Sequence, residues 1–221
     1  MTERSRFDDE VDVDVGAQTL SGHLTAPARA VGTVVFAHGS GSSRHSPRNQ
    51  YVARQLNGDG LATLTFDLLT DAEAQDRRNV FDIDLLASRL ASATDWLRRQ
   101  PAAAELPIAL FGASTGAAAA LVAASDLGCH YAAIVSRGGR ADLAGDRLEM
   151  VRAPTLLIVG GDDAVVLELN QEAARRLRCE HRLTVVPGAT HLFDEPGTLE
   201  AVAALAGEWF VDHCRNLTSD S

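Results

Sequence analysis

Short apolar runs rich in β-branched residues alternate with longer helical segments along most of this chain. Runs of this kind, without polar alternation, are typical of strands that are buried on both faces. Strands that alternate with helices form a mostly parallel, doubly wound sheet with helices on both sides. The sequence therefore predicts an α/β fold. The expected strands are residues 31–38, 61–67, 108–112, 131–136, 154–161 and 182–187, and the expected helices are 47–57, 80–99, 115–125, 168–177 and 198–213.

The start of the chain follows a different pattern. Val11, Val13 and Val15 alternate with acidic residues, and a second strand-like run follows at 20–26 after a short Gly-Ala-Gln turn. Such alternation indicates an antiparallel hairpin with one face in solvent. A length of 221 residues is within the range of one α/β domain. We therefore expect residues 1–221 to form a single domain that includes this hairpin.

The charge of the chain narrows its possible partners. It carries 20 basic and 30 acidic residues, a formal net charge of -10. An acidic surface repels phosphate backbones and anionic lipids, so we expect neither nucleic-acid binding nor membrane docking. All of the basic residues are arginines, because the sequence contains no lysine. This absence excludes a Schiff-base lysine, a pyridoxal-phosphate anchor and a P-loop lysine.

Three widely spaced cysteines, Cys129, Cys179 and Cys214, form no C-x-x-C pair. They indicate neither a disulfide framework nor a zinc site, and we interpret them as buried or half-buried apolar residues. The N-terminal stretch M-T-E-R-S-R-F-D-D-E lacks the apolar core of a signal peptide, and no apolar run is long enough to span a bilayer. We expect a cytoplasmic protein that is a monomer or a homodimer.

Residues 112–116 read G-A-S-T-G and match the motif G-x-S-x-G. The two glycines allow a sharp turn from a strand into a helix, which lifts the Ser114 hydroxyl above the end of the sheet. An apolar strand precedes the motif and an alanine-rich helix follows it, as this turn requires. The alternative role for Ser114 is to cap the helix N-terminus. A cap does not explain the two glycines or the partners downstream, so we interpret Ser114 as a nucleophile.

A serine nucleophile needs a base, and the base needs an orienting carboxylate. His191 lies in the loop G-A-T-H-L-F, after the expected strand 182–187, and so at a carboxyl strand end. His130 and His181 precede strands, which places them at the opposite edge of the sheet, and His213 belongs to the last helix. We therefore expect His191 to be the base and the other three to be surface histidines.

The orienting carboxylate has two candidates. Asp162 and Asp163 both follow the strand T-L-L-I-V-G-G, so both are expected at the carboxyl edge of the sheet. The aspartate that does not contact the histidine is expected to stabilise a turn or cap a helix. Strand position alone leaves this choice open.

The loop H-G-S-G at 38–41 follows the first strand of the expected parallel sheet. Its glycines allow a backbone N–H to point into the cleft, so the Ser40 N–H is a candidate donor for an oxyanion hole. The Thr115 N–H, at the start of the helix after the nucleophile, is the expected second donor. An ordinary Gly/Ser loop would explain H-G-S-G alone, but it fits poorly beside the other motifs.

These motifs together carry a family resemblance. The sequence resembles the α/β-hydrolase superfamily, and most closely its short, cap-less dienelactone-hydrolase-like group, through H-G-S-G, G-A-S-T-G, G-G-D-D-A-V-V and G-A-T-H-L-F in that order. The resemblance extends from about Val31 to Val211. Residues 160–166 fit the pattern G-x-x-D-x-x-V, which implies Asp163 as the acid. It also implies the α/β-hydrolase fold and hydrolysis of an ester, thioester, lactone or similar acyl compound without a cofactor or a metal.

One residue departs from the family pattern. Dienelactone hydrolases proper use a cysteine nucleophile where this chain has Ser114, so dienelactone itself is not the expected substrate. A chain of 221 residues also has no room for a large helical cap domain. We expect an open site, covered only by residues 68–79 and 137–149, which favours small acyl groups.

Two arginine-rich stretches follow carboxyl strand ends, S-R-H-S-P-R-N at 43–49 and S-R-G-G-R at 136–140. Arginine makes bidentate contacts with carboxylates and phosphates, which makes these stretches candidates for binding an anionic group of the substrate. The alternative is that the arginines pair with nearby acidic residues. The candidate substrate-binding residues are Arg44, His45, Arg48 and Arg137.

These features predict a serine hydrolase that cleaves a small carboxylic ester or related acyl substrate. The reaction would use Ser114, His191 and Asp163 and pass through an acyl-enzyme intermediate. A thioesterase or a cofactor-free haloperoxidase on the same fold is one alternative. A non-catalytic binding protein that kept the fold is the other, and it predicts an incomplete set of site residues.

Overall fold

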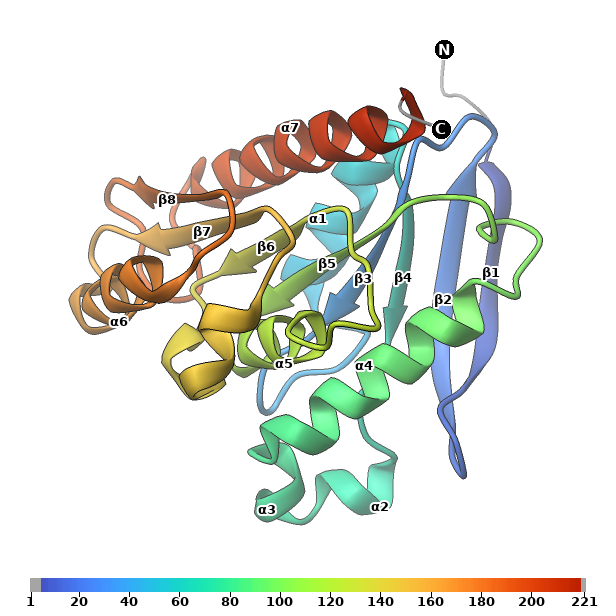
Figure 1. Ribbon diagram of the computed structural model, residues 1–221, viewed down its shortest axis with the longest axis horizontal. Coiled ribbons are helices and arrows are strands. Elements are labelled where there is room, and N and C mark those ends of the chain that lie inside the picture. The colour runs from blue at the N-terminus through green and yellow to red at the C-terminus, as the bar shows by residue number, and fades with distance from the viewer. Residues whose placement is uncertain (1–4, 220–221) are drawn as a thin grey trace.

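The computed structural model describes residues 5–219 and contains an eight-stranded sheet flanked by helices (Figure 1). The strand order is β1-β2-β4-β3-β5-β6-β7-β8. Pairing is antiparallel between β1, β2 and β4 and parallel from β4 through β8. The predicted mostly parallel α/β fold with an N-terminal antiparallel hairpin is confirmed. The strands are β1 (Ser5–Asp14), β2 (Thr19–Pro27), β3 (Thr33–Ala37), β4 (Ala62–Phe66), β5 (Ile108–Ala113), β6 (Ile134–Arg137), β7 (Thr155–Gly160) and β8 (His181–Val186).

The N-terminal hairpin extends the sheet beyond β4. Val13 pairs with Leu20 across the hairpin, and both side chains are buried, whereas Asp12 is exposed next to them. Burial alternates along β2 because the period of a strand sends successive side chains to opposite faces. Residues 1–4, which belong to the N-terminal stretch inspected for a signal peptide, lie outside the described residues.

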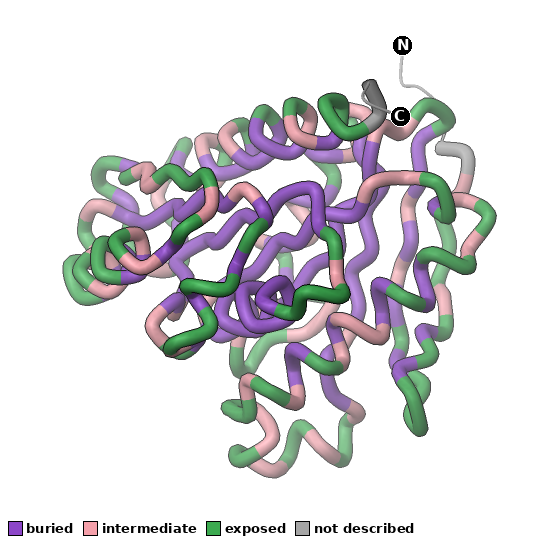
Figure 2. The backbone as a smooth tube through the Cα atoms, in the orientation of Figure 1, coloured by how far each residue is buried: buried purple, intermediate pink, exposed green. Residues whose placement is uncertain are grey.

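Helices cover both faces of the sheet and bury its central strands (Figures 1 and 2). Phe36 and Phe111 form a core on one face with α1 and α7, while α4, α5 and α6 pack against the other face. The helices are α1 (Pro47–Gly58), α2 (Asp71–Ala74), α3 (Arg77–Val80), α4 (Ile83–Leu97), α5 (Thr115–Ala124), α6 (Ala164–Arg176) and α7 (Thr198–Ser219), with a 3-10 segment η1 (Ala141–Met150) between β6 and β7.

The segment after β4, which we expected to cover the site and to which we assigned no helix, contains α2 and α3. Thr70 and Glu73 form a reciprocal cap at the start of α2: the Glu73 N–H donates to Thr70 Oγ1 at 3.2 Å, and the Thr70 N–H donates to Glu73 Oε2 at 2.9 Å. Such a box satisfies two N–H groups that a helix start otherwise leaves unpaired. A cap thus starts a short helix in a stretch that has no apolar stripe.

Helix α6 begins at Ala164, four residues earlier than the expected 168–177. Asp163 is its N-cap residue and accepts the Val166 N–H through its side chain. The start of the helix therefore coincides with one of the two candidate acids.

The parallel arrangement gathers several strand ends at one edge of the sheet. The loops after β3, β5, β6, β7 and β8 all begin at their carboxyl ends, which is where α/β sheets bind ligands. These loops carry the motifs singled out in the sequence.

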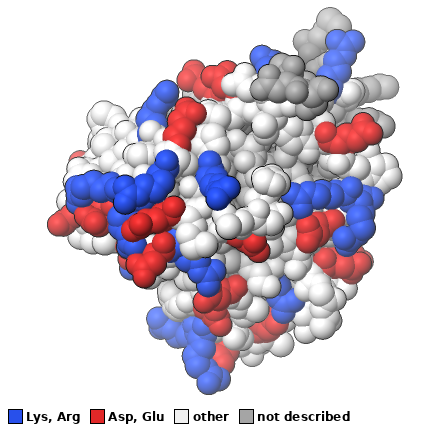
Figure 3. All heavy atoms as spheres, in the orientation of Figure 1, with Lys and Arg blue, Asp and Glu red and all other residues white. Residues whose placement is uncertain are grey.

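Basic and acidic side chains are interspersed over the face seen in Figure 3, so neither sign of charge dominates it. Among residues 5–219, no helix combines the length and the apolar character needed to cross a bilayer.

Candidate active site

Ser114 occupies a sharp turn between β5 and α5. Its backbone has φ 52° and ψ -120°, a region that costs a non-glycine residue on the order of 1–3 kcal/mol. The turn needs glycine at its flanks, because a Cβ on Gly116 would lie 2.2 Å from the Ala37 carbonyl oxygen. Ser114 stands at the N-cap position of α5, but its side chain makes no capping hydrogen bond. The capping alternative therefore does not describe this serine.

His191 and Asp163 are joined by a hydrogen bond. His191 Nδ1 lies 2.7 Å from Asp163 Oδ2, and the two side chains are 39% and 14% exposed. Because Nδ1 faces a carboxylate, we assign the ring proton to Nδ1 and the free lone pair to Nε2. This arrangement leaves the imidazole able to accept a proton on the side away from Asp163.

Asp162 has a different environment from its neighbour. Its side chain is exposed, and its backbone N–H donates to the Ala189 carbonyl at 2.9 Å. The Gly161 N–H donates in the same way to the Val186 carbonyl at 2.8 Å. These two bonds tie the loop after β7 to the loop that carries His191. Of the two candidate acids, Asp163 is the one that the structure brings to the histidine.

The loop after β8, which carries His191, contains a strained residue, Phe193. Phe193 has φ 56°, and among the described residues it shares a positive φ only with Ser114 and glycines. Glu195 fastens the other side of the loop, since its carboxylate accepts the Thr190 hydroxyl at 2.6 Å and the Thr190 N–H at 3.1 Å. These hydrogen bonds lower the pKa of Glu195. Both non-glycine residues with positive φ thus lie at this one site.

The loop after β3 packs directly against the serine. A Cβ on Gly39 would lie 3.1 Å from Ser114 Cβ, so only glycine allows this approach without displacing a neighbour. The next residue, Ser40, donates its backbone N–H to Thr115 Oγ1 at 2.8 Å. The residues of the two predicted oxyanion donors, Ser40 and Thr115, are therefore in contact. In this structure the Ser40 N–H donates to the threonine hydroxyl rather than pointing free into the site.

His38 anchors this loop to the end of β4. Its Nε2 accepts the Leu68 N–H at 3.1 Å, and its Nδ1 lies 3.0 Å from the Gly39 carbonyl oxygen. Burial lowers the pKa of His38, although the Gly39 carbonyl and Asp67 oppose the shift. The ring is therefore neutral near pH 7, with its proton on Nδ1.

A cavity of about 730 Å³ opens beside the loop of residues 38–45. Helices α2 and α3 form its outer wall, so the cover over the site is more structured than the sequence indicated. Much of the lining is apolar, which suits a hydrocarbon or aromatic group. Its apolar walls include Leu68, Leu69, Ala74, Val80, Phe81 and Leu86.

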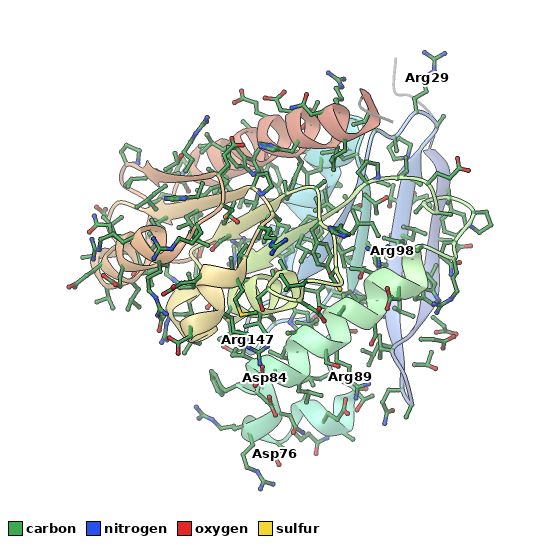
Figure 4. All side chains as sticks on the ribbon, viewed as in Figure 1. Arg29, Asp76, Asp84, Arg89, Arg98 and Arg147 are labelled. Carbon is green, nitrogen blue, oxygen red and sulfur yellow. The ribbon has the colours of Figure 1, made fainter. Side chains whose placement is uncertain are left out.

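Ion pairs join α2 to α4, and α4 to the 3-10 segment η1. Arg89 Nη2 on α4 lies 2.9 Å from Glu73 Oε1 on α2, and both side chains are mostly buried. Arg147 Nη2 on η1 lies 3.0 Å from Asp84 Oδ1 on α4, a more exposed pair that Figure 4 shows. The buried pair contributes more than the exposed one, because water screens exposed charges.

Two of the predicted substrate-binding residues, Arg44 and Arg48, are already paired with acidic residues. Arg44 and His45 line the cavity, and Arg44 Nη1 lies 2.5 Å from Asp67 Oδ2. Arg48 Nη1 lies 3.0 Å from Asp194 Oδ1. Both arginines thus form the pairs with acidic neighbours that were the alternative to substrate binding.

Arg137 lies apart from the cavity lining and is only 7% exposed. Burial, and secondarily the charge of Arg48, lower its pKa to about 10, whereas Asp194 opposes the shift. Its Nη1 has no hydrogen-bond partner among the described residues. Arg137 therefore remains charged at neutral pH while it is buried beneath the site.

The remaining histidines and cysteines lie elsewhere. His130 precedes β6, His181 begins β8 and His213 is on α7. The three cysteines are free thiols, and burial raises the pKa of Cys214 to about 12. Within the part of the chain that the structure describes, no group of three or more His, Cys, Asp or Glu residues is placed to hold a metal ion.

Comparison with known proteins agrees with this architecture. Residues 30–203 match the family described as the alpha/beta hydrolase domain, and the chain belongs to this family. Within it, the chain resembles the dienelactone-hydrolase-like group. The crystal structure of dienelactone hydrolase from Anabaena variabilis shares 53% sequence identity and a TM-score of 0.90, over 93% of this chain and 97% of that one.

Two other comparisons are more limited. Two Mycobacterium tuberculosis proteins, each named "Putative phosphoribosyl transferase", are 64% identical over 206 residues, which is 93% of this chain but 46% of theirs. The chain thus spans a little under half of their length. Est1E from Butyrivibrio proteoclasticus, solved with ferulic acid bound, is 16% identical with a TM-score of 0.77, over 92% of this chain and 98% of that one. This likeness shows the shared fold alone.

Sequence reasoning missed several residues that shape the site. His38 was visible as the first letter of H-G-S-G, and Glu195 lies four residues after His191. Gly138 belongs to S-R-G-G-R, which was interpreted through its arginines only. The positive φ of Phe193 has no signal in the sequence, since phenylalanine rarely adopts it.

Proposed function

We propose that this protein is a serine hydrolase that cleaves a small carboxylic ester or a related acyl substrate. The single observation that carries the proposal is the 2.7 Å contact between His191 Nδ1 and Asp163 Oδ2 at the carboxyl edge of the sheet. The strained turn at Ser114 lies at the same edge and supports it. A nucleophile, a base and an orienting acid are the three parts that acyl transfer by serine requires.

The proposed reaction has two halves. Ser114 Oγ attacks the acyl carbon while His191 Nε2 takes the hydroxyl proton, and the protonated ring then gives this proton to the leaving alcohol. A water molecule then attacks the acyl-enzyme and loses a proton to His191. The protonated ring gives this proton to Ser114 Oγ as the carboxylic acid leaves. Asp163 keeps the ring oriented and stabilises the imidazolium.

The oxyanion of each tetrahedral intermediate would rest on the Thr115 and Ser40 backbone N–H groups. Loss of one such donor costs about 3–4 kcal/mol of transition-state stabilisation in a comparable hydrolase. The Ser40 N–H is bonded to Thr115 Oγ1 here. We infer that the threonine hydroxyl releases this N–H when substrate binds.

We propose the substrate class from the cavity beside residues 38–45, whose lining includes Gly39 and Ser40 but not Ser114 or His191. Its volume of about 730 Å³ is within the usual range of small-molecule pockets. An acetyl group would leave most of it empty. We therefore propose that one side of the ester, acyl or alcohol, is an apolar group at least as large as an aromatic ring.

Two alternatives share this fold. A thioesterase or a cofactor-free haloperoxidase would use the same serine and histidine, and a panel of oxygen esters, thioesters and halogenation assays separates them. A non-catalytic binding protein would bind acyl compounds without turnover. The hydrogen-bonded pair of His191 and Asp163 favours catalysis, because a binding protein has no need of it.

The name of the Mycobacterium tuberculosis relatives describes a different chemistry. This chain matches only 46% of their length. The residues gathered at this site are those of acyl transfer, so we do not propose phosphoribosyl transfer for this chain.

Turnover of p-nitrophenyl esters tests the proposal. We expect Ser114→Ala to lose at least about a thousandfold in kcat and Asp163→Asn to lose at least about a hundredfold. Asp162→Asn is the matched control, since it changes an exposed carboxylate one residue away, and it should stay near the wild-type rate. Equal rates in wild type and Ser114→Ala would overturn the proposal.

A further inference from the structure

Residues 136–140, here named the support segment, run from the end of β6 into η1 and have no part in the reaction proposed above. The sequence S-R-G-G-R first directed attention to their arginines as anion-binding groups. None of the five residues lines the cavity beside the loop of residues 38–45. Their contacts instead lead to the nucleophile and to the base.

The support segment forms hydrogen bonds with both the backbone N–H and the backbone carbonyl of Ser114. The Ser114 N–H donates to the Arg137 carbonyl at 3.2 Å, and the Arg140 N–H donates to the Ser114 carbonyl at 3.0 Å. A residue in a strained conformation persists only where its surroundings determine it strongly. These two hydrogen bonds supply that constraint on either side of the serine.

The same segment touches the base at Gly138. This glycine has φ +51°, and a Cβ built on it would lie 3.2 Å from the His191 carbonyl oxygen and 3.6 Å from His191 Nδ1. It would also lie 3.4 Å from Cε2 of Phe193, the second strained residue of the site. The loop that carries the histidine therefore rests on the surface of Gly138.

The far side of the segment is fixed by the helix that Asp163 caps. Asn170, fully buried on α6, donates from Nδ2 to the Gly139 carbonyl at 2.8 Å and to the Val166 carbonyl at 2.8 Å. The three loops that present serine, histidine and aspartate thus all contact one segment or its anchor.

We infer that the support segment sets the relative position of Ser114 and His191, with Gly138 and Asn170 as positioning residues. This inference rests on the proposed function, because a misplaced base is detectable only if the serine and histidine react. Gly138 acts by its lack of a side chain, which lets the histidine loop approach. Asn170 acts by donating a hydrogen bond to the Gly139 carbonyl, which fixes the segment against α6.

The variant Gly138→Ala tests the first role, and Gly145→Ala is its matched control. Gly145 has φ +56°, close to that of Gly138, but a Cβ there meets nothing within 4 Å. Both variants place a side chain at a positive φ, and we expect both to lower the melting temperature. Only Gly138→Ala should lower kcat, by about 10- to 100-fold with KM nearly unchanged, because a small displacement of a reacting group costs that much.

A second pair of variants tests the hydrogen bond between Asn170 and the support segment. Asn170→Ala removes the anchor of Gly139, and Asn57→Ala removes a comparable double donor, to the Leu61 carbonyl and Thr63 Oγ1, at the end of α1. We expect a lower kcat in Asn170→Ala and a wild-type kcat in Asn57→Ala. If Gly138→Ala and Asn170→Ala react like their controls, the support segment has no positioning role.

The outcomes separate this inference from the proposed function. If the wild-type protein shows no turnover that depends on Ser114, the proposed hydrolase is wrong and the inference falls with it. If the wild type is active and Gly138→Ala retains its kcat, the hydrolase stands and the positioning role is overturned. A Gly138→Ala protein that melts far below Gly145→Ala would show a structural role instead, and would also overturn it.

Discussion

The backbone N–H of Ser40 donates a hydrogen bond to the Thr115 hydroxyl at 2.8 Å. Ser40 and Thr115 are the residues whose N–H groups we propose as oxyanion donors. The Thr115 hydroxyl therefore already accepts the N–H that Ser40 would donate to the oxyanion. This relationship means that the proposed oxyanion hole exchanges an internal hydrogen bond for one to the substrate.

Thr115→Val tests this exchange, because valine has the shape of threonine but no hydroxyl. We expect kcat/KM to rise by roughly fivefold, which corresponds to about 1 kcal/mol for the hydrogen bond that no longer has to break. Steady-state turnover of p-nitrophenyl acetate measures it. A fall in kcat/KM would show that the hydroxyl instead holds Ser40 in its working position.

Phe81→Ala tests the role of the cavity in substrate choice. Phe81 is 47% exposed at the cavity wall, and its removal should weaken binding of an apolar acyl group by about 1 kcal/mol, or roughly fivefold in kcat/KM. The rate with p-nitrophenyl acetate should not change. Leu127→Ala, which removes a 57% exposed apolar side chain away from the cavity, is the control. Equal effects on short and bulky esters would place the substrate elsewhere.

Arg137→Met separates substrate binding from a structural role for the buried arginine. The 7% exposure of Arg137 leaves little surface for a ligand, so we expect anionic and neutral esters to be affected by the same factor. Replacement of a buried charge by an apolar side chain is often neutral for stability, and we expect a change within about 1 kcal/mol. The ratio of kcat/KM for the two esters is the measurement. A selective loss of the anionic ester would restore Arg137 as a substrate-binding residue.

His38 predicts a pH dependence of stability with a definite sign. Burial lowers its folded pKa below the ordinary 6.5, so below about pH 6.5 the unfolded chain binds more protons than the folded one. The free energy of unfolding should therefore fall as the pH drops from about 6.5 through the lowered pKa. In His38→Gln this part of the fall should disappear, because the amide does not titrate and its oxygen accepts the Leu68 N–H.

Urea unfolding at about pH 7.5 and about pH 5.5 measures the effect of His38. His181→Gln is the control, since His181 is exposed on β8 and its Nδ1 lies 3.0 Å from the Cys179 carbonyl oxygen. The same pH dependence in His38→Gln and wild type would contradict the neutral, buried state of His38.

The fold could be predicted because its signals are local. Apolar runs such as 31–38 and 154–161 contain the strands that the structure has at Thr33–Ala37 and Thr155–Gly160. Helices α2 and α3 were missed because their sequence has no apolar stripe, and the signals of their starts were caps, Thr70 with Glu73 for α2 and Asp76 for α3. A periodic pattern of apolar residues predicts helices and strands that pack on a core. It does not predict short exposed helices that are stabilised mainly by their caps.

The candidate site could be predicted in part. Ser114 and His191 follow from a motif and from a strand end, both of which depend on short stretches of sequence. The choice of Asp163 over Asp162 depends on how the chain turns into α6, and the family resemblance supplied what strand position could not. The support of Ser114 by residues 136–140 depends on contacts between distant segments, which no local pattern records.

The most direct test of the central claim is to map the site of covalent labelling by a fluorophosphonate. The protein is labelled, digested and analysed by peptide mass spectrometry, with Ser21→Ala as a control for an exposed serine on β2. We predict one adduct on Ser114 in the wild type and in Ser21→Ala, and none in Ser114→Ala. Labelling of another residue, or no labelling of the folded wild type, would contradict the proposal that Ser114 is an activated nucleophile.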